Sequence, residues 1–306
     1  MTRVACVGAG LVGSAWAFVF ARGGCDVTVY DARGAEARAH TAELLKRTAG
    51  MTGAGPEVAE RVRFADTLAG ALEGAEHVQE SIKEDVGIKR ALFAEMDAIA
   101  GPDTILASST SALLGSTFMD IPGAARALVA HPVNPPSLIP LVELCPTPKT
   151  SAETVDRTRA FMTDLGMKPV DLKKEIDGFL LNRLQYTLVA EAMHLVGEGY
   201  CSAADIDRVL TDGLALRWST LGPFAVAHLN AAGGFRDFVA HLGGMMRTMG
   251  QSAQTDYDWT PEMVEAIHED LARDIPVEKL PEWQGWRDRN ILATRAIQDD
   301  AEGRKP

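Results

Sequence analysis

The chain begins with a glycine pattern that restricts its fold more than any other feature. An apolar run from Val4 leads directly into Gly8, Gly10 and Gly13, and an apolar stretch with helical spacing follows as far as Phe20. In a strand, turn and helix of this kind, the first glycine permits a tight turn and the second lets the backbone approach a pyrophosphate. The third lets the helix pack closely on the strand, and the helix N-terminus faces the phosphates. The sequence therefore predicts the first βαβ unit of a dinucleotide-binding sheet.

An acidic residue at the end of the second predicted strand indicates which dinucleotide binds. Asp31 ends the run Asp-Val-Thr-Val-Tyr-Asp, where a carboxylate accepts from the ribose hydroxyls and repels a 2′-phosphate. Arg33 works against this preference, because an arginine can accommodate the extra phosphate. NAD is therefore the expected cofactor.

Charge and composition exclude several classes of function. The net charge is −12 and no lysine- or arginine-rich run is present, so nucleic acid is not an expected partner. No apolar run is long enough to span a bilayer, and the first strand begins within three residues of the N-terminus, which leaves no room for a signal peptide. The four cysteines have no CxxC spacing and are expected to be reduced, mostly buried thiols. A cytoplasmic protein without bound metal is expected.

Strands alternate with helices through the first part of the chain. Further strands are predicted at residues 61–65, 76–82, 104–109, 127–130, 141–144 and 168–172, with helices at 33–49, 85–100 and 152–165. This alternation is typical of an α/β fold with a Rossmann-type, doubly wound, mostly parallel sheet.

The chain after Gly178 has a different pattern. It shows no convincing strand, and helices are predicted at 179–198, 203–211 and 223–229, with another beginning after Thr260. We expect an NAD-binding domain at residues 1–176 and an all-helical domain for substrate binding and dimerisation at residues 177–306.

Polar side chains follow the later strands of the predicted sheet, where catalytic groups gather in such folds. Ser111 comes after the strand at 104–109, and His131 comes after the strand at 127–130. Glu143 interrupts a short apolar run, and a carboxylate in such a strand needs a partner, for which a histidine is suitable. Oxidation of an alcohol by NAD requires a base, which His131 and Glu143 can supply together.

Two neutral donors complete this candidate site. Ser111 and Asn182 can hold the oxygen as it passes between alcohol and ketone. Each residue also has an ordinary structural interpretation: a histidine at the end of a strand often bonds to backbone, and Asn182 can cap or cross-link helices.

Five stretches together resemble the 3-hydroxyacyl-CoA dehydrogenase family: Gly8 to Gly13, Ser108 to Ser111, His131 to Pro135, Leu141 to Glu143, and Ile176 to Leu184. The resemblance covers essentially the whole chain. It implies that His131 is the acid/base, that Glu143 orients it, and that Ser111 and Asn182 occupy substrate positions. The cofactor contacts that it implies are Leu11, Val12, Asp31, Glu84 and Lys89. For Glu84 and Lys89 the sequence itself indicates only a charged helix start.

Within the family, the chain is most similar to the branch of lambda-crystallin and L-gulonate 3-dehydrogenase. Acyl-CoA members carry a longer, lysine-bearing insertion after the second helix, whereas residues 50–63 are short here and contain no lysine. Arg217 precedes Trp218 where acyl-CoA members have small, uncharged residues. An arginine can bind a carboxylate through two hydrogen bonds, so a free acid is the expected substrate. Alternatively, Arg217 pairs with an acidic residue of its own chain.

The leading hypothesis is therefore NAD-dependent oxidation of the 3-hydroxyl of a small free hydroxy acid, with L-gulonate as the named candidate. L-carnitine dehydrogenase is the main alternative, because it is similar at Ser109 to Ser111 and Leu216 to Trp218. A true 3-hydroxyacyl-CoA dehydrogenase is the next. A crystallin-like structural protein that binds NAD is a non-enzymatic alternative, although such a role does not need the four candidate catalytic residues. The family resemblance also implies a homodimer formed by the helical domain, and Met245, Met246, Trp283 and Trp286 are candidate interface or core residues.

Overall fold

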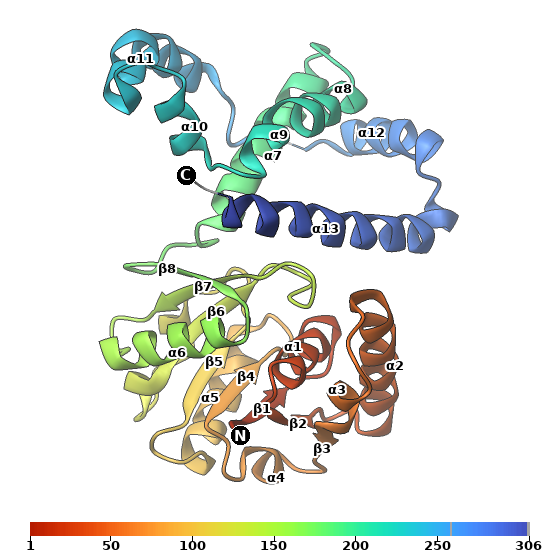
Figure 1. The fold of residues 1–306 in the computed structure, drawn as a ribbon, viewed down its shortest axis with the longest axis vertical. Helices are drawn as coiled ribbons and strands as arrows, with labels where there is room; N and C mark the ends of the chain where they lie inside the picture. The colour runs from red at the N-terminus through yellow and green to blue at the C-terminus, as the bar shows by residue number, and fades with distance from the viewer. Residues whose placement is uncertain (258, 305–306) are drawn as a thin grey trace. The chain divides into compact units, whose positions relative to one another are not determined.

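A computed structural model describes residues 1–257 and 259–304, and these residues form two compact units (Figure 1). The first unit spans residues 1–183 and the second spans residues 184–306. The sequence predicts a domain boundary after Ile176. In the structure, residues 177–183 pack with the first unit. Their attachment has a direct cause, because the backbone N–H groups of Leu180 and Leu181 donate hydrogen bonds to Glu143 within the sheet.

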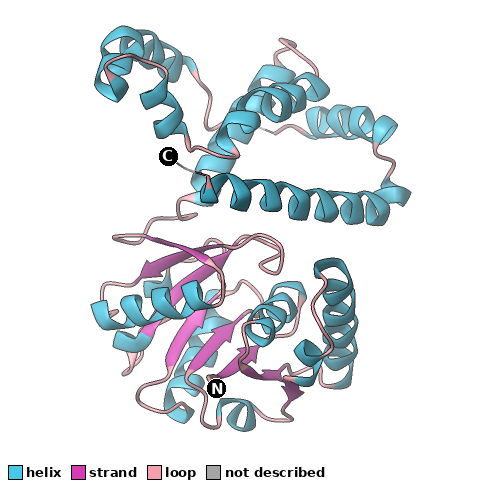
Figure 2. Cartoon of the chain, viewed as in Figure 1, coloured by secondary structure: helices cyan, strands magenta, loops and turns pink. Residues whose placement is uncertain are grey.

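The first unit is built on a single sheet whose strand order is β3-β2-β1-β4-β5-β6-β7-β8 (Figure 2). Neighbouring strands are parallel except for β6 and β7, so β7 and β8 run opposite to the other six. The strands are β1 Arg3–Val7, β2 Asp26–Tyr30, β3 Val62–Phe64, β4 His77–Glu80, β5 Ile105–Ser108, β6 Ala127–Pro132, β7 Leu141–Pro146 and β8 Lys168–Asp171. The prediction of a doubly wound, mostly parallel sheet is confirmed.

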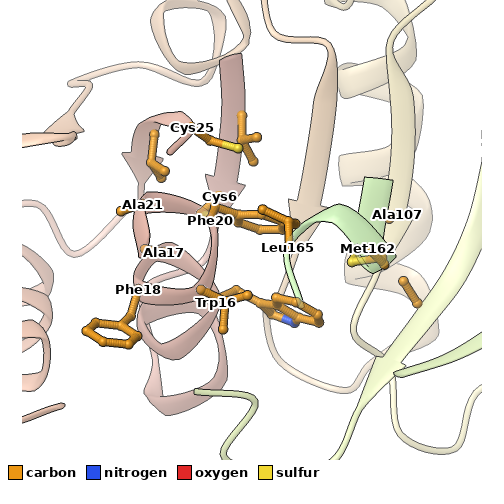
Figure 3. Close-up of a cluster of buried hydrophobic side chains, with 14 of the residues drawn as sticks. Cys6, Trp16, Ala17, Phe18, Phe20, Ala21, Cys25, Ala107, Met162 and Leu165 are labelled. Atoms are coloured by element: carbon orange, nitrogen blue, oxygen red, sulfur yellow. The ribbon is translucent and has the colours of Figure 1, made fainter. Parts of the chain in front are cut away.

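Helices cover both faces of this sheet and enclose two hydrophobic clusters. They are α1 Leu11–Arg22, α2 Ala35–Thr52, α3 Glu57–Glu60, α4 Leu68–Leu72, α5 Val86–Ile99 and α6 Ala152–Asp164. Helix α1 is buried over most of its length because its sequence is apolar on nearly every side. In Figure 3, Trp16 and Phe20 of α1 extend towards Met162 and Leu165 at the end of α6. This packing fixes the start of α1, and with it the glycine turn, against the sheet.

The described residues of the second unit form helices joined by loops, and none of them forms a strand. The helices after β8 are α7 Leu181–Gly197, α8 Ala203–Arg208, α9 Ala215–Trp218, α10 Pro223–Leu229, α11 Gly234–Ser252, α12 Pro261–Asp274 and α13 Leu280–Gly303, with a π-helical turn, η3, at Val209–Leu214. The helix predicted at 203–211 therefore ends early, and the π turn follows it. The predicted cap at Thr260 is present, since its side chain accepts from the N–H of Met263. Within the described residues, no helix is both long enough and apolar enough to cross a membrane.

Candidate active site

The glycine turn between β1 and α1 has the shape that a dinucleotide requires. Gly8 has a φ of +96°, and a Cβ built there would lie 2.6 Å from the carbonyl oxygen of Ser81. A Cβ at Gly13 would collide with the carbonyl of Gly8, so close packing of the helix start excludes any side chain there. In contrast, a Cβ at Gly10 would meet nothing within 4 Å, which leaves open space beside the N-terminus of α1. The turn therefore fits the pyrophosphate of NAD.

Asp31 lies immediately after β2, beside this turn, and is held firmly. Its Oδ2 accepts from the N–H of Ala9 at 2.7 Å, and the guanidinium of Arg33 binds both carboxylate oxygens, at 3.0 and 2.9 Å. Burial raises the pKa of Asp31, but the hydrogen bonds from Arg33 and Ala9 outweigh it and lower the pKa to about 2. The carboxylate is thus ionised at neutral pH, and Arg33 is engaged with it rather than presented to a 2′-phosphate. This arrangement favours NAD.

A cavity of about 570 Å³ opens beside the glycine turn. It is lined by Gly8, Gly10, Asp31, Arg33 and Ser81, together with apolar side chains that include Ile82 and Leu92. Lys83 also lines the cavity. It was not predicted as a site residue, although it directly follows the strand predicted at 76–82. Leu11 is exposed and Val12 half-buried in the first turn of α1, next to the open space at Gly10.

Glu84 and Lys89 belong to a network of charges at the carboxyl end of β4. Lys89 is only 1% exposed, and its Nζ donates to both oxygens of the fully buried Glu80, at 2.8 and 3.0 Å. The same Nζ lies 3.3 Å from a carboxylate oxygen of Glu84. Glu80 was not predicted as a site residue. Its signal was its place in a buried strand, because a buried glutamate requires a cation as its partner. Lys89 is therefore buried and paired with two carboxylates.

Glu84 in turn holds the loop that carries Ser111. Its Oε1 accepts from the hydroxyl of Thr110 at 2.5 Å and from the N–H groups of Ser111 and Ala112, at 2.8 and 3.2 Å. Burial raises the pKa of Glu84, but the hydrogen bond from Thr110, the charge of Lys89 and the two N–H groups together lower it. The ionised carboxylate therefore fixes the position of Ser111.

His131 and Glu143 are brought together by the register of β6 and β7. The two residues lie directly opposite each other in the antiparallel pair, and His131 Nδ1 is 2.9 Å from Glu143 Oε2. Both are buried, with exposed fractions of 5% and 1%. The ring of His131 also contacts the buried ring of Phe179, whose centroid lies 5.3 Å away.

The remaining hydrogen bonds of Glu143 determine the tautomer of His131. Oε1 of Glu143 accepts from the N–H groups of Leu180 and Leu181, at 2.9 and 3.0 Å, where α7 begins. The carboxylate acts as an acceptor on both oxygens, so Nδ1 of His131 must donate. In the neutral imidazole, Nε2 then has no proton and is free to accept one.

The structure also joins the two candidate neutral donors. Nδ2 of Asn182 donates to the carbonyl oxygen of Ser111 at 2.7 Å, which uses one of its two hydrogens. Arg217 lies on α9 in the second unit, where its side chain is exposed and pairs with no carboxylate among the described residues. No group of three or more histidine, cysteine or acidic residues in the described chain is arranged to hold a metal ion.

Three features define the class of protein. They are a glycine turn at the switch point of a doubly wound sheet, an acid beside that turn, and a histidine near the carboxyl end of β6 in the same sheet. The chain is an NAD-dependent dehydrogenase. It belongs to the 3-hydroxyacyl-CoA dehydrogenase family, whose NAD-binding domain matches residues 3–176 and whose C-terminal domain matches residues 178–272.

Individual relatives confirm the family and the lambda-crystallin branch. Lambda-crystallin of Oryctolagus cuniculus is 39% identical over 293 residues, which are 92% of this chain and 92% of the relative. L-carnitine dehydrogenase/betainyl-CoA thioesterase of Rhizobium meliloti is 33% identical over 95% of this chain and 60% of its own length. Among solved structures, an NAD⁺-dependent dismutase, 5-formyl-3-hydroxy-2-methylpyridine 4-carboxylic acid 5-dehydrogenase, is similar over 100% of both chains, with a TM-score of 0.84 and 27% identity.

Proposed function

We propose that this dehydrogenase oxidises the 3-hydroxyl of a small free hydroxy acid, with L-gulonate converted to 3-dehydro-L-gulonate as the best candidate. The observation that carries the proposal is the buried pair of His131 and Glu143 at the strand ends beside the cofactor site. The identity to lambda-crystallin supports the choice of branch.

The geometry of the pair supports acid/base catalysis. Nε2 of His131 accepts the hydroxyl proton, and Glu143 stabilises the imidazolium that forms. NAD, when bound, supplies the hydride acceptor. Asn182 retains one N–H that no described residue accepts, and Ser111 is held beside it, so these two residues can donate to the substrate oxygen as it becomes a ketone.

Two features favour a free acid over a CoA ester. Arg217 has no acidic partner among the described residues, which leaves its guanidinium available for a substrate carboxylate. Residues 50–63, where acyl-CoA members carry the longer lysine-bearing insertion, form the end of α2, a short connection, α3 and the start of β3. They offer no lysine to CoA phosphates.

L-carnitine dehydrogenase is the second candidate, supported by the relative in Rhizobium meliloti. A quaternary ammonium group needs an aromatic or acidic site, and Trp218, which is 40% exposed beside Arg217, is one such aromatic group. Oxidation of a 3-hydroxyacyl-CoA is the third candidate. A structural, crystallin-like role does not explain why the polar residues of the site are held in these contacts.

Initial rates of NADH formation with L-gulonate, L-carnitine and a short 3-hydroxyacyl-CoA test these candidates. We expect L-gulonate to react, and Arg217→Ala to raise its KM by about tenfold or more, because a charge-assisted hydrogen bond is lost. Arg236→Ala removes another exposed arginine from the same unit and serves as the control. Turnover of the CoA ester alone, or an unchanged KM in Arg217→Ala, would overturn the free-acid assignment.

We also propose that the protein is a cytoplasmic homodimer that associates through its helical unit. Among the described residues of that unit, Ala190 is the only buried hydrophobic residue, while Met245, Met246, Trp283 and Trp286 are 55%, 46%, 36% and 54% exposed. Apolar surface of this extent is typical of an obligate interface. The cytoplasmic part of the proposal is supported by the free cysteines, because thiols stay reduced in the cytoplasm. Sedimentation equilibrium is expected to give twice the mass of the chain, and a monomer mass at micromolar concentration contradicts the proposal.

A further inference from the structure

A chain of buried polar side chains runs along β4 towards the cofactor cavity. His77, Gln79 and Ser81 alternate along the strand direction and therefore point to the same face of the sheet. His77 Nε2 lies 3.1 Å from Gln79 Oε1, Gln79 Nε2 lies 2.8 Å from the hydroxyl of Ser109, and that hydroxyl lies 2.9 Å from the hydroxyl of Ser81. Neither the NAD contacts nor the acid/base pair described above uses these residues.

The direction of each hydrogen bond in this chain can be deduced. Gln79 Nε2 also lies 3.3 Å from the carbonyl oxygen of Ala130, which can only accept, so this atom is the amide NH₂. Gln79 Oε1 must then accept from Nε2–H of His77. Burial lowers the pKa of His77 to about 4, so the ring is neutral and carries this single proton. Consequently Gln79 donates to Ser109, and Ser109 Oγ is an acceptor in that bond.

This direction leaves one hydroxyl proton unused. Ser81 and Ser109 carry two hydroxyl protons, and the bond between their oxygens consumes one of them. No acceptor among the described residues takes the other. Both serines are held in place by their backbones, because the N–H of Ser81 donates to Val7 and the N–H of Ser109 donates to Glu80, each at 2.8 Å. The pair therefore has one hydroxyl proton, on Ser81 or on Ser109, available for a ligand.

The pair lies where the nicotinamide half of NAD must lie. Asp31, after β2, marks the adenosine side of the glycine turn, and His131, on β6, marks the reacting carbon. The ends of β4 and β5 lie between them in the sheet, and these strands are followed by Ser81 and Ser109. Ser81 also lines the cavity next to Gly8 and Gly10.

We propose that the hydroxyl pair of Ser81 and Ser109 donates a hydrogen bond to the carboxamide oxygen of the nicotinamide ring. That oxygen is an acceptor on the ring, and the pair supplies the donor, because Gln79 occupies Ser109 as an acceptor and leaves one serine proton unused. The bond would orient the ring for hydride transfer towards one face. The proposal rests on NAD as the cofactor and is independent of the substrate.

Calorimetric titration with NAD⁺ and with ADP-ribose, which lacks the nicotinamide, tests it. We expect Ser81→Ala/Ser109→Ala to raise the Kd of NAD⁺ about three- to tenfold, the effect of one neutral hydrogen bond, and to leave the Kd of ADP-ribose unchanged. Each single variant keeps one hydroxyl proton and should lose less than the double variant. Ser116→Ala, an exposed serine elsewhere in the unit, is the control.

Equal weakening of both ligands would show that the pair only supports the strand ends, and an unchanged Kd of NAD⁺ would show that it does not contact the ring; either result overturns the proposal. A second measurement needs no variant. Thionicotinamide adenine dinucleotide replaces the carboxamide oxygen by sulfur, a weaker acceptor, and is expected to bind the unaltered protein more weakly than NAD⁺. If it binds equally well, the carboxamide oxygen accepts no important hydrogen bond from the protein.

Discussion

Glu143→Gln is expected to lower kcat by roughly 10³- to 10⁴-fold while leaving the Kd of NAD⁺ unchanged, because it reverses the tautomer of His131, the proposed base. The N–H groups of Leu180 and Leu181 will hold the amide oxygen of the new side chain in the position of Oε1. The amide NH₂ then faces Nδ1 of His131, which must accept instead of donate. The proton moves to Nε2, and the atom that should accept the substrate proton can no longer do so.

Stopped-flow measurement of NADH formation, with kcat and KM determined separately, checks this effect. Glu175→Gln changes a glutamate in the same unit that accepts only from the N–H of Ser116 among the described contacts, and it serves as the matched control. His131→Ala should lower kcat by a similar factor. The double variant should lower kcat no more than either single variant, since the two side chains act together in one step. A loss below tenfold for Glu143→Gln would mean that Glu143 does not set the protonation of His131.

Lys89→Met is expected to reduce the free energy of unfolding by about 3–5 kcal/mol, the usual cost of leaving a buried charge without its partner. Glu80 is fully buried, and Lys89 is the cation that donates to both of its oxygens. The hydroxyl of Ser108 and the N–H of Ile82 also donate to Glu80, but neither compensates its charge. Urea denaturation followed by circular dichroism measures the loss.

A second substitution separates the charge from the packing. Glu80→Gln/Lys89→Met removes both charges and should recover most of the stability. The glutamine oxygen can still accept from the N–H of Ile82, and its NH₂ can donate to the hydroxyl of Ser108, which can rotate to accept. Lys149→Met breaks an exposed pair with Asp120 and should lower the free energy of unfolding far less, because water and salt screen that pair. If Lys89→Met behaves like Lys149→Met, the buried pair contributes little to the stability of the fold.

The first unit was largely predictable from sequence, because its local signals agree with one another. The glycine turn, the alternation of strands and helices, and the acid after β2 all specify the same sheet, and each side of β1 is fixed by parallel pairing. Spacing along the chain did not establish by itself that His131 and Glu143 are in contact. Their contact depends on the antiparallel register of β6 and β7, which the sequence does not state directly.

One helix and two long-range contacts could not be predicted from the sequence, for physical reasons. Helix α11 contains Gly243, Gly244 and Gly250, which lower helix propensity, so its long helical course was not predicted. The ion pair of Glu80 and Lys89 joins residues nine positions apart on different elements, and only the packing of α5 against β4 brings them together. In the same way, the long-range bond from Asn182 to Ser111 depends on where α7 begins.

The attachment of Glu143 to the start of α7 has a mechanical consequence. One carboxylate receives two N–H groups at the start of the helix that enters the second unit and also binds the imidazole of His131, the proposed base. A displacement of that helical turn by a fraction of an ångström would lengthen these bonds and rotate the imidazole with them. The position of α7 and the orientation of the His131 ring are therefore coupled through one side chain, that of Glu143.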